Sequence, residues 1–165
     1  MKRTKSDVGR LIAELRLDSE ALDDLGTTNA RAQKRIEKGA SDSLDYAALG
    51  YTIHNVYGVM ENACLRIAKF FENGLSADSW HKDLLRRMLL DIPGTRPALL
   101  SDEAHALLDD LRGFRHIFRN LYNRPLDVDK LLLVQGKVGR AIKLFQEALK
   151  QFEAFLAELQ SGIED

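Results

Sequence analysis

Residues 111–126 concentrate cationic and hydrogen-bonding side chains, and they include no acidic residue. The segment holds one histidine, His116, and four arginines: Arg112, Arg115, Arg119 and Arg124. A planar guanidinium binds phosphate through two parallel hydrogen bonds, and histidine transfers protons near neutral pH. These residue types in one segment indicate a phosphate site. They would suit single-stranded RNA if Tyr122 or Phe118 stacked on its bases.

Helical spacing places these side chains on one side of a helix end. Arg115 and Arg119 lie about 40° apart on a helical wheel, and Tyr122 lies about 20° from Arg115 on the other side. An adjoining strip, about 80–140° round the helix, carries His116, Asn120 and Asn123. Two guanidiniums and a phenol are therefore expected beside a strip of hydrogen-bonding groups.

Arg115 also borders the apolar stripe of its helix, since Leu111 lies four residues before it and Phe118 three residues after it. A guanidinium in that position needs an anion or a set of acceptors to offset its desolvation. Two interpretations remain open. One is a salt bridge to an acid such as Asp109 or Glu61, or a contact with carbonyls at a helix end, and the other is a phosphate site.

Composition limits the classes of function. The 165 residues carry 24 basic and 25 acidic side chains, for a net charge of −1, which excludes a globally basic nucleic-acid binder but not a local basic patch. The single cysteine, Cys64, excludes an internal disulfide and a cysteine-rich zinc site. The histidines lie in separate segments without metal-ligand spacing: His54, His81, His105 and His116. We therefore expect no metal and no cofactor.

Apolar residues at helical spacing predict the elements that must position the site. The first helix is expected over 6–25 with a stop at Gly26, followed by a polar stretch at 27–38 that could form a solvated helix tilted off the core. A break is expected at 39–43. The second helix, capped by Asp42 or Ser43, is expected to span 44–71 and to end at Asn73 and Gly74. The remaining expectations are a helix at 80–90 capped by Ser79, a loop at 91–100, a helix from Ser101 that ends before Pro125, and a last helix from Asp127 to about Leu159.

The pattern predicts an all-α protein, an antiparallel up-and-down bundle of four main helices with one or two short accessory helices. The length suits one domain over residues 1–165. Heptad-like spacing in the last helix would also suit a coiled coil, but the surrounding amphipathic helices favour a bundle. No apolar run is long enough to span a membrane and no secretory signal is present, which predicts a cytoplasmic protein.

The arginine-rich segment resembles the motif of the HEPN superfamily, specifically its HepT-like ribonuclease branch. That motif is an arginine, four residues, a histidine, one residue and a tyrosine. Arg115 and Tyr122 match it, and Asn120 stands where the histidine is expected. Two further phrases are similar to the family's Tyr-x-x-x-Glu and Trp-His-x-x-Leu-Leu stretches: Tyr57-Gly58-Val59-Met60-Glu61 and Trp80-His81-Lys82-Asp83-Leu84-Leu85. The similarity extends over about residues 40–160.

The resemblance implies a bundle that forms a homodimer, with two motifs across a shared cleft. It also implies a metal-independent endoribonuclease of a toxin–antitoxin pair, whose partner is a minimal nucleotidyltransferase that can adenylylate Tyr122. The catalytic candidates are then Arg115, Asn120 and His116, and the phosphate- or RNA-binding candidates are Arg112, Arg119, Arg124 and Tyr122.

Asn120 opens a second interpretation, because an asparagine cannot transfer a proton usefully. Either His116 substitutes for the missing histidine, or the chain is a degenerate module. Such a module would bind a nucleotide, RNA or the nucleotidyltransferase without cleaving. A third interpretation is a purely structural bundle whose arginines are salt-bridged.

Overall fold

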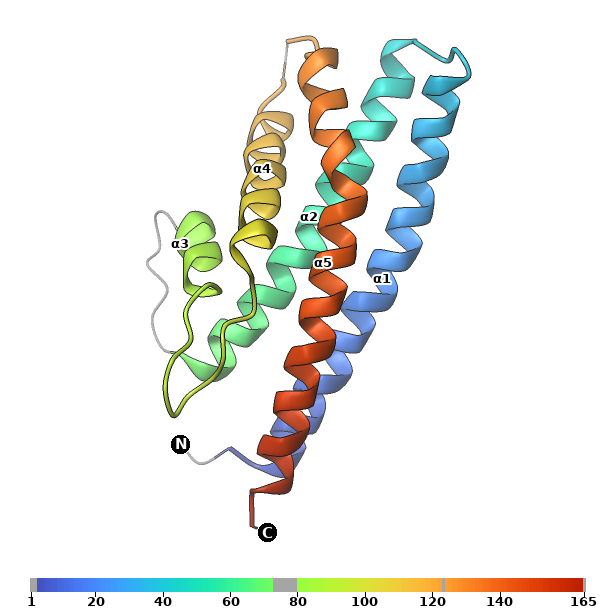
Figure 1. Cartoon of the computed structure of the whole chain (residues 1–165). Coiled ribbons are helices and arrows are strands. Elements are labelled where there is room, and N and C mark those ends of the chain that lie inside the picture. The colour runs from blue at the N-terminus through green and yellow to red at the C-terminus, as the bar shows by residue number, and fades with distance from the viewer. Residues whose placement is uncertain (1–2, 73–79, 123, 165) are drawn as a thin grey trace.

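Residues 3–72, 80–122 and 124–164 are described by the computed structural model, and they form five helices. The helices are α1 (Lys5–Glu37), α2 (Ser43–Phe71), α3 (Trp80–Arg87), α4 (Asp102–Arg119) and α5 (Val128–Ser161). Successive long helices run in opposite directions, and short α3 packs outside α2 and α4 (Figure 1). The predicted all-α bundle of four main helices is confirmed, with α3 as its one accessory helix in the described chain.

Side-chain caps begin the four long helices. The Asp42 carboxylate accepts from the backbone N–H of Leu44, and Ser101 and Asp127 accept from backbone N–H groups three residues later. Thr4 caps α1 in the same way. Each such cap contributes about 1 kcal/mol because it satisfies a donor that has no partner within the helix. The expected caps at Asp42, Ser101 and Asp127 are confirmed, whereas those at Asn73, Gly74 and Ser79 lie outside the described residues.

The expected stop at Gly26 is wrong, because α1 continues through it to Glu37. A Cβ added at Gly26 would lie 3.3 Å from the Ile142 side chain of α5, so this glycine permits a close helix contact. The polar half of α1 is also held to the bundle. Asn29 is buried and its amide bonds to Thr52 on α2 and Gln135 on α5, each at 2.8 Å. The chain turns instead at Gly39, whose φ of 104° favours glycine.

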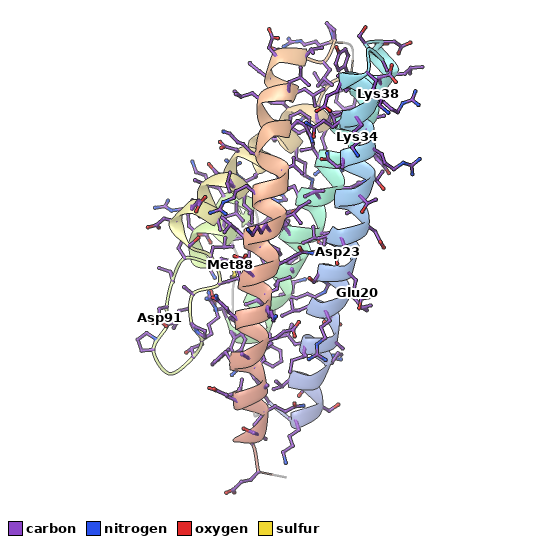
Figure 2. The ribbon with its side chains drawn as sticks, turned by 45° about the vertical axis from the view of Figure 1, so that its right-hand side comes forward. Glu20, Asp23, Lys34, Lys38, Met88 and Asp91 are labelled. Carbon is purple, nitrogen blue, oxygen red and sulfur yellow. The ribbon has the colours of Figure 1, made fainter. Side chains whose placement is uncertain are left out.

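Solvent-facing and buried side chains separate as the helical periodicity requires. Glu20 and Lys34 of α1 and Lys38, the C-cap of this helix, extend outward (Figure 2). Met88, just beyond α3, is fully buried. The core runs along the inside of the four long helices and includes Tyr57, Phe145 and Phe152. This packing fixes how α2, α3 and α4 face one another around the site.

The connection from α3 to α4 is built around Arg96. Its guanidinium is fully buried, binds the Glu72 carboxylate and donates to the backbone carbonyls of Arg87, Leu90 and Pro97. α3 ends at Arg87, beyond which the N–H groups of Leu89 and Leu90 donate to carbonyls three residues back, so the expected helix to 90 is too long by three residues. The expected loop at 91–100 is therefore ordered from inside by one cation.

A matched pair of glycines in α2 tests the contact that brings α4 against it. A Cβ at Gly50 would lie 2.8 Å from Phe118 Cε2, whereas one at Gly58 would meet nothing within 4 Å. We expect Gly58→Ala to raise the free energy of unfolding by up to about 1 kcal/mol, because alanine favours a helix over glycine. Gly50→Ala should lower it, because overpacking costs about 1–3 kcal/mol and outweighs that gain. Urea unfolding of both variants measures the difference, and equal stabilisation would refute the close contact.

Candidate functional site

A pocket of about 300 Å³ lies where α2, α3 and the end of α4 meet. Three elements far apart in the sequence contribute to its wall. The lining residues are Tyr57 and Glu61 from α2, His81 from α3, Arg112, Arg115, His116 and Arg119 from α4, and Asn120 and Tyr122 just beyond α4. Six of these nine side chains are acidic or basic, so the pocket is polar.

Glu61 is the central acid of this pocket, and its side chain is 4% exposed. Arg115 Nη1 donates to Glu61 Oε1 at 2.6 Å, and His81 Nδ1 lies 2.6 Å from Glu61 Oε2. The salt bridge that the sequence left open for Arg115 is therefore present, with Glu61 as the acid. The other candidate acid, Asp109, instead pairs with Arg112 at 2.8 Å.

The salt bridge uses only part of the Arg115 guanidinium. Among the described residues, one of its five N–H groups has a hydrogen-bond partner, and the buried Nε has none. The guanidinium also lies over the Tyr57 ring, 5.6 Å from its centroid, which orients it further. Because a guanidinium presents five donors, Arg115 can hold Glu61 and still donate to an anion in the pocket.

Two further arginines have no acidic partner among the described residues. Arg119 and Arg124 are exposed and form no ion pair there. Arg124 lines a second, open hollow beside the pocket together with His116, Asn120 and Tyr122. The acid-free sequence segment thus becomes a surface with uncompensated positive charge.

The end of α4 differs from the expected geometry. The helix ends at Arg119, so Asn120 is its C-cap and Tyr122 lies beyond the helix, not on its wheel. The Asn120 side-chain amide donates to the His116 carbonyl at 2.7 Å, and the Tyr122 N–H donates to the Asn120 carbonyl. This turn still brings Tyr122 to the pocket wall, with its ring 84% exposed. The expected position of Asn123 falls outside the described residues.

Of the two rings considered for base stacking, Tyr122 is the accessible one. Phe118 is partly buried, with its ring centroid 5.7 Å from that of Phe114 and 5.9 Å from that of His54. Packing between α4 and α2 therefore takes Phe118 into the core, whereas Tyr122 stays open to solvent.

The field in and near the pocket shifts several pKa values. Burial, with the neighbouring Glu61 carboxylate, raises the pKa of Tyr57 far above its usual range, and the phenol stays protonated. Burial first, then the charges of Arg115 and Arg119, lower the pKa of His54. Burial also raises the pKa of the Cys64 thiol, which keeps it protonated and unreactive.

Sequence reasoning left three pocket residues without a functional role. Tyr57 and His81 were not candidates, and Glu61 was considered only as a salt-bridge partner. The sequence does contain a signal for them, because all three lie in the two stretches that are similar to the family, 57–61 and 80–85. Spacing along one helix could not place them beside Arg115, since they come from α2 and α3.

Within the described ranges, no cluster of three or more histidine, cysteine or acidic side chains could hold a metal ion. None of the helices in that part of the chain is long and apolar enough to cross a membrane.

An all-helical bundle with an arginine-rich pocket at the end of α4 fits the HEPN class that the sequence phrases indicate. A family model described as HepT-like protein matches residues 48–156, well over half of the chain, including every pocket residue. The chain therefore belongs to the HepT-like family of the HEPN superfamily. Neither the search of curated proteins nor that of solved structures finds a significant match.

Proposed function

We propose that this protein is a metal-independent endoribonuclease of a cytoplasmic toxin–antitoxin system, silenced by a minimal nucleotidyltransferase. The observation that carries the proposal is the convergence of Arg112, Arg115, Arg119 and two histidines on one pocket. Arginine donors stabilise the charge that develops on phosphorus, and histidine moves protons near neutral pH. Both requirements of metal-free RNA cleavage are thus met by side chains of this chain.

The residues divide into roles by their exposure. Arg115 and Arg119 bind the scissile phosphate. Arg124 extends the positive surface along the RNA backbone, and Tyr122 stacks on a neighbouring base. The same 84% exposure leaves the Tyr122 hydroxyl open to adenylylation by the partner. An adenylyl group there would place a bulky anion over the pocket mouth and block RNA.

The active form in this proposal is a homodimer that joins two pockets across a cleft. Ile117 lies beside the pocket and is 50% exposed. Apolar surface next to a charged site suits coverage by a second copy of the chain. A dimer would also lengthen the positive surface available to an RNA strand.

One observation favours a second candidate, a module that binds without cleaving. Asn120 stands where the family motif has histidine, and its amide is engaged in capping α4 through the His116 carbonyl. In this alternative the arginines bind a nucleotide, RNA or the nucleotidyltransferase, and no proton is transferred.

Incubating the purified protein with single-stranded RNA in excess EDTA separates the two candidates. We expect cleavage that EDTA does not inhibit, with products ending in a 2′,3′-cyclic phosphate and a 5′-hydroxyl. RNA that stays intact at protein concentrations that maintain the dimer would contradict the nuclease proposal. Asn120→His should create cleavage if the wild-type protein is a degenerate module. If the wild-type protein already cleaves robustly and Asn120→His cleaves at the same rate, degeneracy is excluded.

Co-expression with a neighbouring small nucleotidyltransferase, followed by mass spectrometry of Tyr122, tests the partner.

A further inference from the structure

His81 is the histidine that the geometry holds most firmly in the pocket. Leu84 and Leu85 are fully buried and anchor α3 against α2 and α4. His81 lies one turn before Leu84, so the anchored face of α3 carries it toward the pocket. Trp80 packs partly against the core and stacks on the imidazole, with the two ring centroids 3.7 Å apart. The His81 ring is thus held on one face by Trp80.

The hydrogen bond to Glu61 determines which nitrogen of His81 is available for chemistry. An ionised carboxylate only accepts hydrogen bonds, so the 2.6 Å contact places the proton on Nδ1 when the imidazole is neutral. Nε2 then carries the lone pair, and it has no hydrogen-bond partner among the described residues. A histidine with one nitrogen fixed by a buried carboxylate and the other free has the arrangement of a general base.

The same carboxylate holds both the cation and the imidazole. Glu61 Oε1 accepts from Arg115 and Glu61 Oε2 faces His81, which fixes the two functional groups relative to each other. A phosphate held by the remaining Arg115 donors would lie beside the His81 ring, since both residues line the same pocket. Asn120 and His116, by contrast, lie at the end of α4, where the Asn120 amide binds a backbone carbonyl.

We infer that His81, oriented by Glu61, is the catalytic base that replaces the histidine missing at position 120. This inference rests on the proposed nuclease function. His81 Nε2 takes the proton of the ribose 2′-hydroxyl, and the 2′-oxygen forms a bond to phosphorus. The bond from phosphorus to the 5′-oxygen breaks, and the leaving oxygen takes a proton from water in the pocket. The products are a 2′,3′-cyclic phosphate and a 5′-hydroxyl, and His81 gives its proton to the hydroxide that the water leaves, which regenerates the neutral imidazole.

The test compares single-turnover cleavage by the wild-type protein with that of four variants. His81→Gln keeps a donor for Glu61 but cannot transfer a proton, and we expect it to slow cleavage at least about a hundredfold. His81→Ala should be equally slow and should regain activity when imidazole is added. His116→Ala should lose much less, and His105→Ala, on α4 outside the pocket, serves as the matched control. Binding of RNA with a 2′-deoxyribose at the cleavage position should be retained by both His81 variants.

The outcomes distinguish this inference from the proposed function. If the wild-type protein cleaves and His81→Gln cleaves at a similar rate, the inference is overturned and the nuclease function stands. Loss of cleavage without imidazole rescue, accompanied by loss of RNA binding, would make His81 structural and also overturns it. A wild-type protein that cleaves no RNA removes both proposals.

Nitrogen NMR gives a readout that does not depend on activity. The His81 ring should show the Nδ1-protonated tautomer in the wild-type protein, and Glu61→Gln should shift the tautomer equilibrium. A dominant Nε2-protonated tautomer in the wild-type protein would contradict the orientation on which the inference depends.

Discussion

Replacing Arg115 by alanine is expected to reduce RNA cleavage at least about a hundredfold, because removal of one preorganised donor to transition-state charge costs about that much. The loss has a structural cause that exposed arginines lack. The Arg115 side chain is only 19% exposed, and its guanidinium is held in place by Glu61 and the Tyr57 ring. A donor that is already held in position needs no reorganisation as negative charge develops. Single-turnover cleavage at saturating protein measures the effect.

The same substitution leaves the buried Glu61 carboxylate without its cation, with His81 as its remaining hydrogen-bond partner, so it also costs stability, on the order of 3–5 kcal/mol. Cleavage is therefore compared at a temperature at which circular dichroism shows that the variant is folded. Arg86→Ala is the control, because Arg86 is an exposed arginine of α3 that does not line the pocket. If Arg115→Ala and Arg86→Ala lose the same amount of cleavage activity, the loss comes from the change in total charge and not from the pocket.

Replacing Arg96 by alanine is expected to be the most destabilising change in the connection between α3 and α4. The guanidinium is 0% exposed, binds Glu72 and donates to three backbone carbonyls. Its removal takes away one donor from each of these carbonyls and leaves Glu72 with Arg87, 3.6 Å away, as its cation. Breaking one partner of a buried ion pair costs about 3–5 kcal/mol. For a protein of this size, that lowers the melting temperature by at least about 6 °C.

Thermal unfolding of two further variants shows whether burial is the cause. Arg140→Ala breaks an exposed two-point contact with Glu103 and should leave the melting temperature nearly unchanged, because solvent screens that pair. Arg96→Lys keeps the charge but loses the planar fork, and should fall between the wild-type protein and Arg96→Ala. If Arg96→Ala melts like the wild-type protein, Arg96 does not hold the connection.

Local patterns were enough to predict most of the fold. The helices begin at side chains that satisfy free N–H groups, such as Asp42, Ser101 and Asp127, and this effect acts within a few residues. One glycine, Gly26, was a misleading signal, whereas the chain does turn at Gly39. At Gly26 its small size serves a contact with Ile142 from a helix more than a hundred residues away, and no local pattern contains that contact.

The pocket also depends partly on local sequence and partly on contacts between residues that are distant in the sequence. Positive charge without acids at 111–126 is visible in the amino-acid sequence, and the stretches similar to the family mark the segments around Glu61 and His81. The packing of the helices brings Arg115 and His81 to one buried carboxylate, while Arg119 forms no ion pair with any residue that the structure describes. The helical periodicity of the sequence shows which residues share one face of one helix. The distance between side chains on three helices depends on how α2, α3 and α4 pack, and that packing decides which histidine can act on a phosphate bound by Arg115.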